Sequence, residues 1–168
     1  TPEAKRVSYA ASWGSETVDD RLKPAIAGLL KRFDAVSVRE KSGVEIVSKM
    51  GLSAAWVPDP TLLHDAGYWG RIADEAKQRT SAKTLFMCEY RWSPCVPLGK
   101  VREVLCEIYG WRTVKPFSNR PFREMNFSCL SPSEWLDEIR RASFVLSNSY
   151  HGILFSIIFQ RPFMAVPL

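Results

Sequence analysis

The chain has 168 residues, enough for one domain or two small lobes, and its 46% hydrophobic and 24% charged residues are typical of a globular protein rather than a disordered one. Its 23 basic and 18 acidic residues give a net charge of +5, and the basic residues are spread along the chain, so the composition does not predict nucleic-acid binding. The four cysteines form no CxxC pair and do not cluster with the two histidines, which favours reduced thiols in a cytoplasmic protein over a zinc site or a disulfide framework.

No apolar segment of this sequence predicts a membrane span or a signal peptide. No stretch approaches about 18 uncharged apolar residues, and the start, Thr1–Arg6, lacks the apolar core of a signal peptide. We therefore expect no transmembrane segment. The chain begins without methionine and stops inside the apolar run Pro162–Leu168, so we expect a domain-sized part of a longer protein.

Short apolar or β-branched runs alternate with longer segments of helical period. This alternation is typical of an α/β fold, in which parallel sheets are flanked by helices. The predicted strands are 6–11, 35–39, 54–58, 84–89, 111–115, 143–148 and 163–167.

The helices between these strands have their own start and stop signals. The apolar residues within 22–33 follow one helical face and predict a helix. Pro24 must stand in the first turn of this helix, because a proline ring would break an interior turn. The sequence from Ser42 to Glu45 predicts a capping box, and Gly51 closes that helix.

The mostly polar helical stretch 69–81 comes next. Residues 71–82, which overlap this stretch, are the predicted junction between a lobe over 1–70 and a lobe over 83–168. The segment 116–130, with two prolines and no period, predicts a functional loop.

The last part of the chain has the clearest helix signals. Ser131-Pro-Ser-Glu134 predicts a capped start, because the serine caps, the proline fits the first helical position and the glutamate follows three residues later. We expect this helix to reach Arg141. The helix that has His151 in its first turn is almost entirely apolar, which predicts burial between the sheet and a neighbour.

Polar residues follow three of the predicted strands. Ligands of parallel α/β sheets bind beyond the carboxyl ends of the strands, so these residues are the candidates for a site. They are Ser37–Glu40, Pro58–Thr61 and Asn148–His151.

Arg39 and Asp59 each allow two interpretations. The guanidinium of Arg39 can bind a carboxylate or phosphate through two parallel hydrogen bonds, whereas the alternative is a salt bridge to Glu40 or a solvated position at a helix start. Asp59 precedes a proline and is held extended, which suits a structural turn, the favoured interpretation, or a carboxylate pointed into a cleft.

The turn from Asn148 through Ser149 to His151 predicts an anion site. The first turn of a helix leaves backbone N–H groups without intrahelical partners and carries the positive end of the helix dipole. His151 stands beside it, and histidine is the side-chain type that most often serves as an acid or a base in enzymes. The alternative is that His151 caps its own helix or fills a polar gap, and His64, in a loop, is expected at the surface.

Several familiar sites are absent from the sequence. It contains no GxGxxG, no P-loop, no serine nucleophile elbow and no HExxH, so a dinucleotide-binding role is not predicted. No set of histidine, cysteine and carboxylate residues has metal-ligand spacing, so no metal site is predicted and a metal requirement stays open.

The stretches that carry these candidates resemble, in order and spacing, the polysaccharide pyruvyl transferase family. Together they cover most of the chain outside about 62–128. They are Val7–Ser15, Phe33–Gly43, Asp59–Leu63, Ser133–Leu136, Ser143–Gly152 and Phe155–Phe159.

The resemblance implies two Rossmann-like lobes similar to GT-B glycosyltransferases, incomplete here at both ends because family members usually run longer. The implied reaction transfers pyruvate from phosphoenolpyruvate, a donor substrate rather than a cofactor, to two hydroxyls of a sugar and forms a pyruvate ketal. The acceptor is a cell-surface polysaccharide or its lipid-linked precursor. The implied location of the protein is the cytoplasm, or the inner face of the membrane if the protein associates with it peripherally.

For this reaction we expect His151 to be the acid–base group and Arg39 to bind the donor's carboxylate or phosphate. Asn148, Ser149, Asp59 and Glu40 complete the expected substrate site. Two alternatives use the same scaffold: a glycosyltransferase with a nucleotide-sugar donor, and a noncatalytic glycan-binding module.

Overall fold

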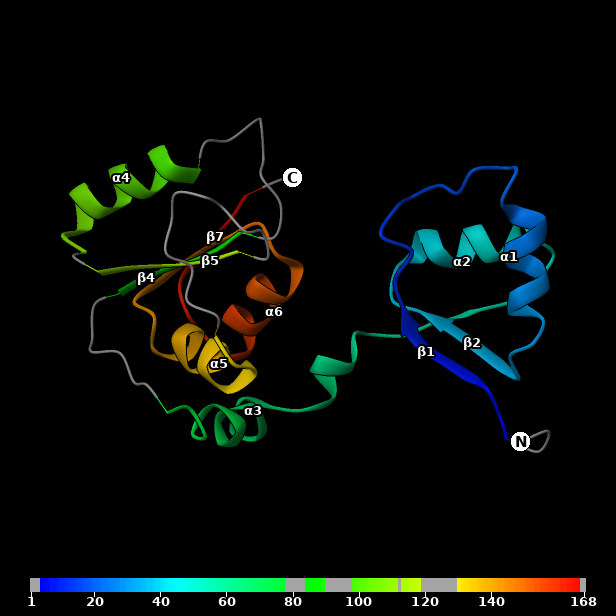
Figure 1. The fold of residues 1–168 in the computed structure, drawn as a ribbon, viewed down its shortest axis with the longest axis horizontal. Coiled ribbons are helices and arrows are strands. Elements are labelled where there is room, and N and C mark those ends of the chain that lie inside the picture. The colour runs from blue at the N-terminus through cyan, green and yellow to red at the C-terminus, as the bar shows by residue number, and fades with distance from the viewer. Residues whose placement is uncertain (1–3, 78–83, 90–97, 112, 119–129, 167–168) are drawn as a thin grey trace. The chain divides into compact units, whose positions relative to one another are not determined.

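The computed structural model describes residues 4–77, 84–89, 98–111, 113–118 and 130–166, which are coloured in Figure 1. The chain divides into two compact units, Thr1–Leu63 and His64–Leu168, and each is built on its own parallel sheet with flanking helices. The predicted α/β class is therefore confirmed. The predicted junction over 71–82 stays a prediction, since part of it lies outside the described residues.

The first unit is a three-stranded sheet in the order β1-β2-β3 with all strands parallel. Helix α2 contributes the buried Ile46 and Val47, next to the buried Val38 of β2. The elements are β1 (Val7–Ala11), α1 (Lys23–Leu30), β2 (Ala35–Val38), α2 (Lys41–Ser48), β3 (Ala55–Trp56) and the 3-10 helix η1 (Pro60–Leu63).

Two helix signals in this unit are confirmed and one is wrong. Pro24 lies in the first turn of α1, and Gly51 follows α2 with a φ of +73°. The capping box at Ser42 is wrong, because α2 begins at Lys41 and its N-cap, Glu40, makes no side-chain cap bond. The chain leaves β2 at Val38 and turns at once into the helix, so Ser42 falls inside the first turn.

Strand β1 carries an irregularity just before its carboxyl end. Its register with β2 shifts between Ser8 and Ala11, and Ala10 has a φ of +50°. The hydroxyl of Ser37 spans the gap, since it donates to the Ser8 carbonyl (3.0 Å) and accepts from the buried Ala10 N–H (3.0 Å). A side chain from β2 thus replaces a ladder hydrogen bond that the irregular strand cannot make.

Replacing Ser37 by alanine is expected to cost about 1–3 kcal/mol in the free energy of unfolding, because the buried N–H of Ala10 would lose its acceptor. Urea denaturation measures the loss. Ser53→Ala, an exposed serine with no hydrogen bond among the described residues, is the control and should shift stability by less than about 0.5 kcal/mol. Equal losses in both variants would contradict the bridging role.

The second unit is a four-stranded sheet in the order β5-β4-β6-β7, again with every strand parallel. Parallel strands need crossover connections, and helices of this unit supply them. The elements are α3 (Ala66–Ala73), β4 (Thr84–Glu89), α4 (Leu98–Tyr109), β5 (Thr113–Ser118), α5 (Pro132–Arg141), β6 (Phe144–Ser147), α6 (Tyr150–Ile158) and β7 (Phe163–Ala165).

The two faces of this sheet bury separate clusters, because successive strand residues point to opposite faces. Phe86 and Cys88 of β4 and Val145 of β6 pack with α5 and α6, whereas Leu85 and Met87 pack with α4. Figure 1 shows α5 and α6 together on one side of the strands and α4 on the other. The sheet is thus the middle of three layers.

Helix α3 is tied to α5 through Arg140. This guanidinium donates to the Gly70 carbonyl (3.1 Å), to Asp74 (2.8 Å) and to the buried Asp137 (2.7 Å). Burial lowers the pKa of Arg140, but the hydrogen bonds to Asp74 and Asp137 outweigh it and the pKa lies above its ordinary value. The predicted capping box at Ser131 and Glu134 is confirmed at the start of α5.

Three elements of this unit differ from prediction. Strand β5 covers 113–118 instead of 111–115 and so includes Pro116, which an edge strand tolerates because one row of its N–H groups makes no ladder bonds. The predicted loop therefore begins later, and 119–129 lies outside the described residues. Helix α3 starts before 69 because Asp65 caps it by accepting from the Tyr68 N–H (2.8 Å).

Helix α6 is buried on one face rather than all round. Its Leu154 and Phe155 are buried, but Ile157 is 55% exposed in the described part of the chain. His64 lies at the surface as predicted and stacks on Tyr68. Among the described residues, no helix is long and apolar enough to cross a bilayer.

Candidate functional site

The turn between β6 and α6 lies at the carboxyl edge of the second unit's sheet. Ser147 ends β6 fully buried, and its hydroxyl accepts from the Ser149 N–H (3.0 Å). Asn148 is 4% exposed, and its N–H donates to the Cys88 carbonyl (3.2 Å). These bonds hold the turn against the neighbouring strand β4.

Ser149 is the N-cap of α6. Its backbone is extended (φ −88°, ψ 129°), and its hydroxyl accepts from the Gly152 N–H (3.4 Å). This arrangement fixes the start of the helix, so Tyr150 and His151 occupy its first two positions. The predicted helix start, with His151 in the first turn, is confirmed.

Gly152 lets the helix start lie directly against the strand. A Cβ at this position would collide with the Ser147 hydroxyl oxygen and would lie 3.2 Å from the Cys88 sulfur. The close approach therefore requires a residue without a side chain. It places the first turn of α6 on the carboxyl ends of β4 and β6.

His151 is partly exposed at the end of α6 that carries the positive dipole. Its ring lies edge-on to Tyr150, with 5.2 Å between ring centroids, and Tyr150 is itself 49% exposed. An imidazole with access to solvent, beside the backbone N–H groups of a helix start, can exchange a proton with a bound anionic ligand. The geometry thus suits the acid–base role, which stays a prediction.

Cys88 lies beside this turn, but its thiol is buried in the core. The thiol is 2% exposed. Burial raises its pKa more than the hydrogen bonds to Ser149, Trp135 and Ser147 lower it, so the thiol stays protonated near neutral pH. Cys88 is therefore a packing residue of the site and not a nucleophile.

A second polar cluster lies at the carboxyl edge of the first unit's sheet. Arg39, directly after β2, donates from Nη1 to Asp59 (2.8 Å) and from Nε to Glu40 (3.2 Å). The Asp59 side chain is 2% exposed, and its second oxygen accepts from the N–H (3.0 Å) and the hydroxyl (2.7 Å) of Thr61. Asp59 thus closes the turn after β3 and orients the guanidinium as well.

The sequence did not single out Ser12 in this cluster, although Ser12 follows β1 as Arg39 follows β2. Its hydroxyl donates to the same Glu40 oxygen that Arg39 contacts, at 2.5 Å. The rule that ligands bind beyond the carboxyl ends of parallel strands would have included it. With Glu40 and Asp59 ionised, one guanidinium faces two carboxylates and the cluster has a formal charge of −1.

The candidate residues therefore form two groups, one in each unit. Arg39, Glu40 and Asp59 lie together in the first unit, and Asn148, Ser149 and His151 in the second. The salt bridge between Arg39 and Glu40, one of the alternatives from the sequence, is present. Common action of Arg39 and His151 on one ligand stays a prediction.

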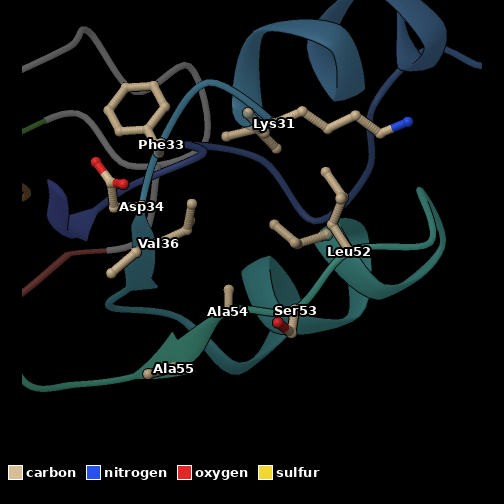
Figure 2. Close-up of a pocket in the computed structure, with 11 residues that line it drawn as sticks. Lys31, Phe33, Asp34, Val36, Leu52, Ser53, Ala54 and Ala55 are labelled. Carbon is tan, nitrogen blue, oxygen red and sulfur yellow. The ribbon is translucent and has the colours of Figure 1, made fainter. Parts of the chain in front are cut away.

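A cavity of about 680 Å³ in the first unit lies away from these residues. It opens at the amino ends of β2 and β3, the opposite edge of the sheet from Arg39. Figure 2 shows Val36 and Leu52 at its walls and the Lys31 side chain extending away from Asp34. Because it contains none of the candidate residues, we do not assign the reaction to it.

The described residues contain no group of three or more histidine, cysteine, aspartate or glutamate side chains arranged to hold a metal ion. In the first cluster the guanidinium of Arg39 pairs instead with Asp59 and Glu40.

A family model described as polysaccharide pyruvyl transferase matches residues 2–167. The match spans both units and so includes both candidate clusters. No curated protein and no solved structure matches the chain.

Proposed function

Since the chain belongs to the polysaccharide pyruvyl transferase family, we propose that it transfers pyruvate from phosphoenolpyruvate to two hydroxyls of one sugar and forms a cyclic ketal. The acceptor is a sugar of a cell-surface polysaccharide or of its lipid-linked precursor. The observation that carries the proposal is the turn 147–152, where an accessible histidine stands at a helix start that favours anions.

The reaction requires a proton donor, a proton acceptor and an anion-binding site from the protein. Protonation of the methylene carbon of the donor makes its C2 electrophilic, and one sugar oxygen bonds to C2 as its hydroxyl loses a proton. The bond between C2 and the phosphate oxygen then breaks, and phosphate leaves with the bonding electrons. The second sugar oxygen bonds to C2 as its hydroxyl loses a proton. The protein must therefore supply a proton, accept protons from hydroxyls and hold a multiply charged anion.

His151 is the proposed acid–base group. Its ring is accessible, and Ser149 and Gly152 fix the helix start that carries it. The dipole of α6 favours negative charge at the same place, so the phosphate of the donor is proposed to bind at the start of α6, next to Asn148 and Ser149, whose own N–H groups hold the turn in place.

Arg39 is the proposed partner of the donor's carboxylate. Its bond to the buried Asp59 (2.8 Å) is shorter than its bond to the half-exposed Glu40 (3.2 Å). A donor carboxylate would therefore replace Glu40 at the guanidinium while Asp59 continues to orient it. Glu40, still bonded to Ser12, would then accept a hydrogen bond from a sugar hydroxyl.

We further propose that the two units are the lobes of a GT-B-like enzyme. Their separate parallel sheets with flanking helices support this proposal. Arg39 and His151 would then act from different lobes on the same donor, and a structure with bound phosphoenolpyruvate would test their convergence.

The experiment that tests the function is incubation with phosphoenolpyruvate and a panel of hexose-containing acceptors. Phosphate release that depends on an acceptor, with an acceptor mass gain that matches a ketal, is the expected result. Nucleotide release from a nucleotide-sugar would instead support a glycosyltransferase on the same scaffold. Glycan binding without turnover of either donor would overturn both enzymatic proposals.

Arg39→Lys is expected to raise the KM for phosphoenolpyruvate about tenfold, because lysine keeps one charge but loses the forked geometry that Asp59 orients. Initial rates over a range of donor concentrations measure the change. Arg21→Lys is the matched control, since Arg21 pairs with Asp19 at the surface and is 88% exposed. An unchanged KM in Arg39→Lys would remove Arg39 from the donor site.

A further inference from the structure

A cavity of about 460 Å³ in the second unit is lined by three arginines. We call it the arginine groove. One wall is a face of α3, and the other is the end of α6 with the turn that follows it. Its lining includes Gly67, Gly70, Arg71, Asp74, Arg140 and Arg161.

The groove is separate from the candidate site. His151 lies in the first turn of α6, whereas Phe159 is the C-cap of the same helix and lines the groove. Eight residues of helix place the two ends about 12 Å apart. The groove also lies where the chain returns to the amino end of β7, so it is at the opposite edge of the sheet from the turn 147–152.

The shape of the α3 wall follows from its sequence. Gly67, Gly70, Arg71 and Asp74 are spaced i, i+3, i+4 and i+7, so they share one face of the helix. The two glycines have no side chains and so leave space above that face of the helix. An added Cβ at Gly70 would lie 3.5 Å from the guanidinium of Arg140. Larger side chains at these positions would fill the groove.

Positive charge is in excess in the groove. Arg140 is engaged by Asp74 and Asp137, as described above. Arg71 lies over the Tyr68 ring (5.6 Å), and Nε of Arg161 donates to the Phe159 carbonyl (3.2 Å). The charge of Arg140 is met by the two aspartate carboxylates, whereas within the described residues neither Arg71 nor Arg161 forms an ion pair, so the excess positive charge of the groove comes from Arg71 and Arg161.

We propose that the arginine groove binds a phosphate group. A phosphate monoester carries about 1.5 to 2 negative charges near neutral pH and has three acceptor oxygens for the guanidiniums of Arg71 and Arg161, whereas a carboxylate carries one charge on two oxygens. Guanidinium groups bind phosphate oxygens through paired hydrogen bonds. The guanidinium of Arg140 is held in one orientation at the groove by its bonds to the Gly70 carbonyl and to Asp74. The volume exceeds that of a phosphate ion, so the group belongs to a larger molecule, either a soluble phosphate ester or a lipid headgroup.

Nuclear magnetic resonance of isotope-labelled protein, titrated with inorganic phosphate, tests the proposal. The readouts are the amide signals of Gly67, Gly70 and Gln160, which distinguish the groove from the turn at His151. We expect saturable shifts at these three amides, with chloride at equal ionic strength giving none.

Arg71→Gln with Arg161→Gln is expected to weaken phosphate binding at these amides at least about tenfold, and the double lysine variant should be intermediate because it keeps charge without the fork. Arg6→Gln with Arg32→Gln, two exposed arginines of the first unit, removes the same charge and should change binding less than about twofold. Arg71 and Arg161 are both exposed, and thermal unfolding of each variant confirms that it is folded.

Vesicles distinguish the two sources of phosphate. Sedimentation with phosphatidylcholine vesicles that contain phosphatidic acid, lost in the double glutamine variant, would assign a lipid headgroup. Binding of free phosphate without such sedimentation would assign a soluble ester. Absence of saturable shifts at the groove amides, or equal weakening in the control variant, would overturn the proposal, and neither result depends on pyruvyl transfer.

Discussion

Replacing His151 by alanine is expected to lower kcat for phosphate release from phosphoenolpyruvate by about 10²–10⁴-fold, the usual contribution of a positioned acid–base group. The free energy of unfolding should change little, because the ring is partly exposed and the helix start is held by Ser149 and Gly152 instead. The KM for the donor should change far less than kcat, since the backbone groups of the helix start remain.

The second histidine supplies the control for this prediction. His64 is exposed, stacks on Tyr68 and lies outside the turn 147–152, so His64→Ala should keep the turnover of the unmodified protein. Steady-state rates with a saturating acceptor give kcat for both variants. Retained turnover in His151→Ala would remove this residue from the mechanism, whereas loss in both variants would indicate damage that is not specific to the site.

Replacing Gly152 by alanine is expected to lower the free energy of unfolding by about 1–3 kcal/mol or more, the range for an added methyl group in a packed interior. The new Cβ would meet the Ser147 hydroxyl, which is fully buried and accepts from the Ser149 N–H, so the turn and not merely one side chain must shift. Turnover should fall as well, because His151 follows directly on this turn.

Gly28→Ala is the matched control for Gly152→Ala. Gly28 lies inside α1, and an added Cβ there meets no atom within 4 Å, so alanine should stabilise by up to about 1 kcal/mol through helix propensity. Urea denaturation compares the two variants. Adding Ser147→Ala to Gly152→Ala should recover part of the lost stability if the collision is the cause. Equal stability of Gly152→Ala and the unmodified protein would disprove the close approach.

Local signals in the sequence predicted the helix starts best where the cap and its partner are close in the chain. Ser131 and Glu134 are three residues apart, and their reciprocal bonds follow from that spacing alone. The same reasoning failed at Ser42, because the end of β2 determined where α2 begins. Pro116 was excluded from a strand, although the edge position of β5, a property of the whole sheet, tolerates it.

The candidate residues were predicted from their places after strands, but their partners were not. Arg39 and Asp59 are 20 residues apart, and their bond depends on the parallel pairing of β2 with β3. Ser12 reaches Glu40 from β1, past the irregularity at Ala10. The alternation of one strand rules out a slip of one residue, but it does not determine which other strand lies alongside it, and these contacts depend on that neighbour.

The strand order β5-β4-β6-β7 also has a consequence for how the second unit acquires its structure. Leu85 of β4 pairs with Phe144 of β6, about sixty positions later in the chain, and contacts at such separation close slowly. During synthesis β4 leaves the ribosome with both of its edges open until β5 and β6 arrive. The nascent chain is therefore expected to depend on chaperones that cover exposed strands until the sheet is complete.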